Sequence, residues 1–355
     1  MMNLLQRTLK QIYPQDSASR DQARYRLDQL ALPPWALGDL MDLAVDLAGM
    51  TRSQHPPVAR KAIVTMAGDH GVVVEGVSKF PQEVTLQMVY NFVNGGAGIN
   101  ALARQAHAEV VVVDMGVNAD LRELADQGKI LNKKVGLGTD NIAVGPAMSR
   151  AMAQRAVESG IDVANQLSER IDLFGTGDMG IANTTPSTAI AAVLTGKDVA
   201  EVAGRGTGLN DEQLAHKIEV VSRAIAVNSP NARDGLDVLA KVGGFEIGGI
   251  AGLIIGAAAN RKPILVDGFI STAGALIAYA IEPFVRDYII CAHRSMEPGH
   301  RFMMEKLGCR PLLDLNMRLG EGTGAAVAMN LVEAAVAVLT EVATFSEAAV
   351  AQSDK

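Results

Sequence analysis

Short runs rich in β-branched residues alternate with longer helical patterns along most of this chain of 355 residues. This alternation constrains the fold more than any other feature of the sequence. The clearest runs predict strands at residues 62–66, 109–113, 171–174, 263–266 and 287–291. Strands that alternate with helices form parallel sheets, because each crossover lays a helix on one face of the sheet. We therefore expect an α/β fold with a parallel sheet flanked by helices.

Polar or glycine-rich residues follow the expected strands at once. They include Asp69 and His70 after the first strand, Asp178 after the third, Asp267 after the fourth and His293 after the fifth. The carboxyl ends of parallel strands meet at one edge, and ligands of open α/β sheets bind beyond that edge. We therefore expect these loops to converge on one crevice. For His70 itself the expected role is structural, as for most single histidines.

The two ends of the chain lack this alternation, because the pattern before residue 55 and after about residue 328 is purely helical. The two helical ends are expected to pack together. The sequence thus predicts a large α/β domain over residues 56–327. A small helical domain is expected from residues 1–55 together with residues 328–355.

Composition argues against several classes of function. The net charge of −7 and the isoelectric point near 5.5 give no electrostatic reason to expect nucleic acid or a membrane as a partner. The most apolar run, residues 248–259, is too short to span a bilayer, and the first residues hold no apolar run of signal-peptide length. Cys291 and Cys309 lack metal-ligand spacing, so neither a disulfide nor a zinc site is expected. The expected compartment is a reducing cytoplasm.

One carboxylate stands among glycines directly before a long helical pattern, in the segment Gly320-Glu321-Gly322. Glycines let a backbone approach a ligand and adopt positive φ without strain, and a helix N-terminus attracts an anionic group. Glu321 is therefore a candidate general base. The alternative is that Glu321 caps the helix and takes no part in chemistry.

Two glycine-rich segments have the composition of phosphate-binding loops. The first, residues 174–186, follows a strand, and its Asn183 is expected to begin a helix with free backbone N–H groups. The second, residues 204–208, precedes a helix that carries Lys217, a suitable cation for a monophosphate. Neither loop fits the Walker A pattern, and no GxGxxG is followed by an acidic ribose ligand at the proper distance. Taken alone, each loop also fits a simple tight turn.

Seven blocks of the chain, taken together and in order, resemble one enzyme family. They are ALPPWALGDLMDLAVDLAGM, GDHGVVVEGVSKFPQEVTLQMV, GTGDMGIANTTPSTAI, KVGGFEIGGIAGLIIGAA, ILVDGFIS, HRSMEPGH and MRLGEGTGAA. They are similar to the nicotinate-nucleotide:dimethylbenzimidazole phosphoribosyltransferases, which activate the lower-ligand base of cobamides, and the resemblance covers nearly the whole chain. It implies a Rossmann-like sheet with a small helical domain, in agreement with the pattern above.

The resemblance also implies a reaction and a set of site residues. Enzymes of the family displace nicotinate from nicotinate mononucleotide with an aromatic base and form an α-linked nucleotide. The family's catalytic base falls on Glu321, and no cofactor or metal is implied, because no pyrophosphate leaves. Asp178 stands where the family usually has Glu. The residues expected along the nucleotide and its phosphate are Asp178, Gly180, Asn183, Gly206, Gly208, Lys217 and Ser295.

The residues expected around the aromatic base are Phe80, Pro81, Met88, Met179 and Leu319. In typical benzimidazole-using members a Ser and a Gln stand at the positions of Phe80 and Met88, and a Leu at that of Met179. The more apolar pocket favours phenol or p-cresol, which carry one hydroxyl on an otherwise apolar ring. The alternative is neutral drift, with 5,6-dimethylbenzimidazole retained as the acceptor.

The resemblance bears on partners as well. The phenol-using branch pairs a catalytic subunit with a related second chain, so a dimer is expected, either of two identical chains or with a paralogous chain. A non-catalytic paralogous binding subunit is the alternative from another class, and the presence of Glu321 argues against it. A dinucleotide-dependent oxidoreductase would suit the sheet, but the missing fingerprint argues against that class.

Overall fold

The computed structural model describes residues 2–206 and 208–351. Its centre is a parallel sheet of six strands in the order β3-β2-β1-β4-β5-β6. The order reverses between β1 and β4, as in Rossmann-like folds, so the expected fold class is confirmed. The strands are β1 Lys61–Gly68, β2 Ala108–Gly116, β3 Leu131–Asn132, β4 Leu173–Met179, β5 Ile264–Val266 and β6 Ile289–Cys291.

β4 departs most from the expected strands. The sequence predicts a glycine-rich loop after residue 174, whereas β4 continues through Asp178 and pairs with β1 over that length. Glycine is depleted in strands, so composition hid this extension. Packing requires the glycines, because a Cβ on Gly175 would collide with Ile63, and a Cβ on Gly177 would collide with the backbone of Glu321. The short edge strand β3 has no apolar run from which it could be predicted.

Helices cover both faces of the sheet. α12 (Phe245–Ala259) packs on β1, β2 and β4, and α7 (Arg150–Ser168) packs on α12. α5 (Gly98–Gln105) and α15 (Thr323–Glu341) pack against each other, α5 on β2 and α15 on β4 and β5.

The remaining helices are short or lie further from the sheet. They are η1 Gly71–Glu75, α4 Glu83–Val93, α6 Arg122–Asp126, α8 Thr184–Thr195, α9 Val199–Val202, α10 Asp211–Asn228, α11 Gly235–Val242, α13 Phe269–Ile281, η2 Pro283–Tyr288 and α14 Gly299–Leu307. Among them α8 is central, because it packs on α10, α11, α13 and α14.

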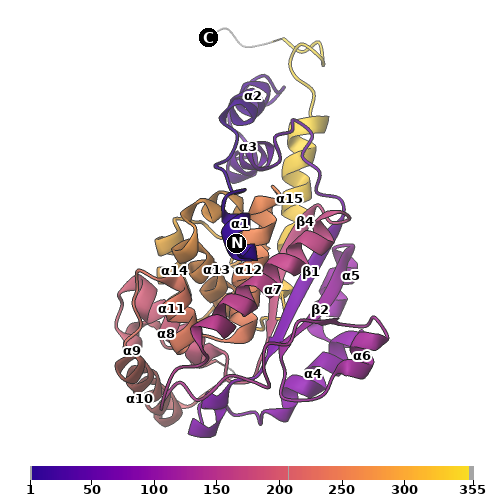
Figure 1. Cartoon of the computed structure of the whole chain (residues 1–355). Helices are drawn as coiled ribbons and strands as arrows, with labels where there is room; N and C mark the ends of the chain where they lie inside the picture. The colour runs from indigo at the N-terminus through magenta and orange to yellow at the C-terminus, as the bar shows by residue number, and fades with distance from the viewer. Residues whose placement is uncertain (1, 207, 352–355) are drawn as a thin grey trace.

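The two ends of the chain meet beside the sheet. α2 (Ser17–Leu27) and α3 (Asp39–Thr51) pack together and against α15, and they stand apart from the strands in Figure 1. α1 (Leu4–Leu9) lies instead on α7 and α12. A boundary between residues 327 and 328 would fall inside α15, which reaches from the sheet to α2 and α3. The division into domains over 56–327 and over 1–55 with 328–355 stays a prediction.

Among the described residues, α15 is the one helix long and apolar enough to cross a membrane by length and composition. Of its apolar window, 56% is buried inside the protein, where α15 packs against α3, α5 and the sheet. Packing within the protein therefore accounts for its apolar character.

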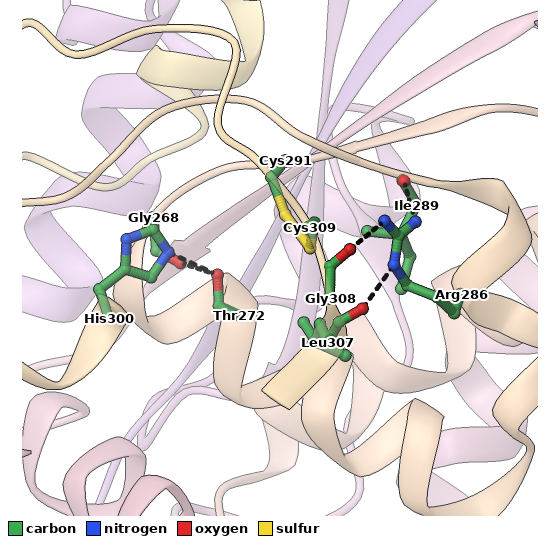
Figure 2. The surroundings of a disulfide bond; sticks show 9 residues. All are labelled: Gly268, Thr272, Arg286, Ile289, Cys291, His300, Leu307, Gly308 and Cys309. Atoms are coloured by element: carbon green, nitrogen blue, oxygen red, sulfur yellow. Dashed lines mark hydrogen bonds between the residues drawn. A yellow bond between two sulfur atoms is a disulfide. The ribbon is translucent and has the colours of Figure 1, made fainter. Parts of the chain in front are cut away.

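The two cysteines pair in the structure, so the expectation that they form no disulfide is wrong. Cys291 ends β6, and Cys309 lies just after α14. α14 returns the chain to β6, and a sequence separation of 18 residues does not reveal this return. Arg286 holds the end of α14 beside the pair, because its Nε donates to the backbone oxygen of Leu307 at 2.6 Å and its Nη2 to that of Gly308 at 2.9 Å (Figure 2).

Candidate active site

A cavity of about 350 Å³ lies beyond the carboxyl ends of β4, β5 and β6, at the edge where the sequence predicts a crevice. It brings together residues predicted for all three roles. Gly208, Lys217 and Pro81 do not line it, although the other predicted residues do. Those in its wall are Glu321, then Asp178, Gly180, Asn183, Gly206 and Ser295 from the nucleotide set, and Phe80, Met88, Met179 and Leu319 from the aromatic set.

Glu321 lies in a turn with uncommon backbone angles. Gly320, Glu321 and Gly322 have φ values of +82°, +62° and +95°, in the left-handed region that favours glycine. The carboxylate is buried, with 6% of the residue exposed, and its Oε2 accepts the backbone N–H of Ile99 at 3.0 Å. Glu321 therefore does not cap α15, whose N-cap is Gly322, but points at the start of α5.

The surroundings of Glu321 shift its pKa upward. Burial raises the pKa of Glu321 above the ordinary value of 4.5, the Ile99 N–H lowers it, and the negative charge of Asp267 raises it again. A carboxylate whose pKa is raised toward neutrality accepts a proton more readily than an exposed one. Glu321 thus has the environment of a general base.

Asp178 lies near the end of β4, in the cavity wall. Its Oδ2 accepts the side-chain N–H of Asn183 at 3.1 Å, and its Oδ1 has no hydrogen-bond partner. Burial raises the pKa of Asp178 well above its ordinary value, and the charges of Asp267 and Glu246 raise it further. A carboxyl group that keeps its proton donates a hydrogen bond, so Asp178 can bind a hydroxyl or ring oxygen of a ligand.

The predicted start of α8 is confirmed, because Thr184 is its first residue and Asn183 its N-cap. Lys217 on α10 is fully buried behind this helix start, where its Nζ donates to Thr184 Oγ1 at 2.8 Å and to the backbone oxygen of Gly204 at 3.4 Å. Burial lowers the pKa of Lys217 to about 8, while the charge of Glu297 raises it. An ammonium group thus lies just outside the cavity, next to its glycine loop.

The aromatic set forms the mouth of the cavity. Phe80 is 47% exposed and Leu319 is 61% exposed, whereas Met88 and Met179 are half-buried. Pro81 is exposed, precedes α4 and does not line the cavity. These side chains offer a ligand an apolar wall beside the carboxylate of Glu321.

Some cavity residues had no assigned role in the sequence. Gly268 lies two residues after β5, and this position after a strand is the signal that could have found it. His293, two residues after β6, was expected near the crevice but had no role assigned. Glu297 and Arg318 carry no such signal. The buried carboxylate of Glu297 lies against Gly204, where a Cβ would collide with it. His70 lies outside the cavity and bonds Glu246, its Nε2 being 2.7 Å from Oε1.

A buried histidine supports the wall of the cavity. The Nδ1 of His300 accepts the backbone N–H of Ser295 at 2.9 Å, and its Nε2 lies 2.9 Å from Thr272 Oγ1. The Thr272 hydroxyl donates to the backbone oxygen of Gly268 at 2.7 Å. Figure 2 shows how these hydrogen bonds link His300, Thr272 and Gly268. Burial, together with the charge of His293, lowers the pKa of His300 to about 3. His300 is therefore neutral and orders two segments of the wall.

This low pKa predicts how stability depends on pH. In the unfolded chain His300 takes up a proton near pH 6.5, whereas in the folded protein it does so only near pH 3. Its contribution is therefore complete above pH 6.5 and is lost as the pH falls, by up to about 1.4 kcal/mol per pH unit. We expect His300→Asn, which keeps an acceptor for Ser295 but cannot be protonated, to lose this dependence. Urea unfolding at pH 7 and pH 5 measures it, and a constant difference in unfolding free energy between the two proteins would contradict the prediction.

Fold and site together define a Rossmann-like α/β protein with a ligand cavity at the carboxyl edge of its sheet. The chain belongs to a family described as phosphoribosyltransferase, whose model matches residues 12–350. It is 68% identical to the nicotinate-nucleotide–dimethylbenzimidazole phosphoribosyltransferase of Desulfotalea psychrophila, over the full length of both chains. The protein of the same name from Syntrophotalea carbinolica is 60% identical, over 99% of each chain. The crystal structure of CobT from Thermus thermophilus superposes with a TM-score of 0.91 at 46% identity, covering 95% of this chain and all of that one.

Proposed function

We propose that the protein transfers the 5-phosphoribosyl group of nicotinate mononucleotide to 5,6-dimethylbenzimidazole and releases nicotinate. The names of the relatives support this reaction, because they contain nicotinate-nucleotide and dimethylbenzimidazole. The observation that carries it is the buried carboxylate of Glu321 in a cavity with an apolar mouth on one side and glycine loops on the other.

The proposed chemistry needs one base and a bound sugar phosphate. A ring nitrogen of the benzimidazole attacks C1′ of the ribose, and the bond from C1′ to nicotinate breaks. The electron pair of that bond stays on the ring nitrogen of nicotinate. The pyridinium charge is thereby cancelled, and nicotinate leaves. The proton on the second ring nitrogen passes to the carboxylate of Glu321. Asp178, in its protonated form, donates a hydrogen bond to the ribose, and the loop around Gly206 together with Lys217 holds the phosphate.

A direct assay tests this proposal. The purified protein is incubated with nicotinate mononucleotide and 5,6-dimethylbenzimidazole, and nicotinate and the new nucleotide are separated by chromatography. We expect equal amounts of the two products. Absence of nicotinate release with every aromatic base offered would leave a binding subunit as the function.

The acceptor differs from the one that the sequence favoured. Phenol and p-cresol are not named by the relatives, so 5,6-dimethylbenzimidazole becomes the main acceptor in our proposal. The phenols remain a second candidate because Phe80, Met88 and Met179 offer no polar group to a second ring nitrogen. An apolar pocket discriminates weakly between similar rings, so both classes of base are compatible with it.

A competition assay with a double variant tests the acceptor. The wild type is expected to transfer the phosphoribosyl group faster to dimethylbenzimidazole than to phenols, but at a measurable rate to both. Phe80→Ser combined with Met88→Gln should reduce phenol transfer relative to benzimidazole transfer by about five- to a hundredfold, because an unpaired polar group beside an apolar ring costs about 1–3 kcal/mol. The matched control is Tyr90→Gln, an exposed residue of the same helix α4. No phenol transfer by the wild type, or an unchanged product ratio in the variant, would remove the second candidate.

A further inference from the structure

We propose that Asp267 is a positioning residue that holds the turn of Glu321, and with it the carboxylate, in its working position. The inference rests on the proposed function, because it requires Glu321 to act as the base. Asp267 does not line the cavity, so its side chain acts on the reaction from outside it, through the turn that it binds and through its charge, which raises the pKa of Glu321.

The contacts of Asp267 lead to this turn. Asp267 follows β5 directly and is 1% exposed. Its Oδ1 accepts the backbone N–H of Ala325 at 3.0 Å, and its Oδ2 accepts that of Gly322 at 3.3 Å. The N-cap of α15 is Gly322, which has no side chain for capping. Asp267, in the segment that follows β5, therefore supplies the missing cap of α15.

The turn needs such support. The φ of +62° at Glu321 is uncommon for a residue with a side chain and persists only where its surroundings fix it. On one side Thr65 donates its hydroxyl to the backbone oxygen of Glu321 at 3.1 Å. Asp267 binds the following N–H group, so the peptide group between Glu321 and Gly322 is held at both its oxygen and its nitrogen. A residue held in this way has its carboxylate fixed relative to the cavity.

Asp267 is itself fixed in place. Its backbone N–H donates to Thr176 Oγ1 at 3.1 Å, and the Nε2 of His293 lies 3.7 Å from its Oδ1. His293 also packs on Gly324, where any Cβ would collide with the imidazole ring. The start of α15 thus contacts Asp267 and His293, which follow the neighbouring strands β5 and β6.

The first measurement is the effect of Asp267→Asn on the kinetics. The amide keeps the size of the side chain but presents only one acceptor, so one of the two N–H groups loses its partner. We expect kcat to fall about tenfold or more, while KM for nicotinate mononucleotide stays within about twofold. The matched control is Asp114→Asn, because Asp114 is also buried, lies in β2 and accepts the backbone N–H of Val117 at 3.0 Å. This control should leave kcat within about twofold.

A double-mutant cycle separates positioning from general support of the fold. If Asp267 acts through the carboxylate of Glu321, Asp267→Asn should change the residual single-turnover rate of Glu321→Gln by less than about twofold. A merely structural residue would lower both backgrounds by the same factor, and that result would overturn the inference. Should Asp267→Asn not fold, Asp267→Ser, which keeps one acceptor, takes its place in the same cycle.

The cycle also distinguishes the two proposals. Full activity of Glu321→Gln would remove Glu321 as the base and thereby the proposed mechanism. A large loss in Glu321→Gln, combined with normal kcat in Asp267→Asn, would leave the proposed function standing and refute the positioning role alone.

Discussion

Replacing Glu321 by glutamine is expected to lower kcat by about a hundredfold or more, because a general base typically contributes a factor of hundreds to thousands. The amide keeps the size of the side chain and can still accept the N–H of Ile99. Binding of nicotinate mononucleotide, measured by calorimetry, should therefore be unchanged. Glu305→Gln, an exposed substitution on α14, serves as the control.

The pH profile gives a second test of the same residue. The base must be ionised to accept a proton, so kcat/KM should fall as the pH drops through the pKa of Glu321. Burial raises that pKa above 4.5, which places the loss of activity at a higher pH than for an exposed glutamate. Near-normal turnover of Glu321→Gln across the whole range would contradict the assignment.

Replacing Lys217 by methionine is expected to raise KM for nicotinate mononucleotide by about ten- to a hundredfold. A hydrogen bond to a charged group contributes about 1.5–3 kcal/mol, and methionine fills the buried space without a charge. KM for the aromatic base should stay within a few-fold, because Lys217 lies on the side of Thr184, away from the apolar mouth. Lys306→Met, which alters an exposed lysine of α14, is the control.

The ionisation of Lys217 gives this prediction a pH dependence. Burial lowers its pKa to about 8, so the ammonium group is present below that pH and is lost above it. In the wild type KM for the nucleotide should rise above about pH 8, and in Lys217→Met this rise should be absent. An unchanged KM in the variant would show that Lys217 only fills the interior behind the loop.

The fold could be predicted because its determinants are local. A β-branched run predicts a strand, a polar residue after it predicts the carboxyl edge, and parallel strands bring those edges together. Asp267 and His293 were found in this way, since each lies within two residues of the end of a strand. The same reasoning failed at Gly175 and Gly177, where glycines indicated a loop and the structure has β4. Glycine is needed at these two positions because Ile63 and Glu321, which are far away in the sequence, pack against them.

The candidate site divides in the same way. Glu321 stands out because its signal is local: it is a lone carboxylate with a glycine on each side. Glu297 does not, because its burial against Gly204 depends on two segments that are separated by the whole of α10 to α13. The pairing of Cys291 with Cys309 likewise depends on the path of α14.

The sequence by itself determined the α/β class, the family, the edge of the sheet where the cavity lies, and Glu321 as the candidate base. These follow from periodicity, from residue types next to one another and from seven colinear blocks, all of which are properties of neighbouring residues. The tertiary structure alone decided that Asp178 lies on a strand in surroundings that raise its pKa, that Lys217 stands behind the cavity wall, and that Asp267 caps α15. Burial and charge set each of these, and both depend on which distant segments surround a side chain once the chain has folded.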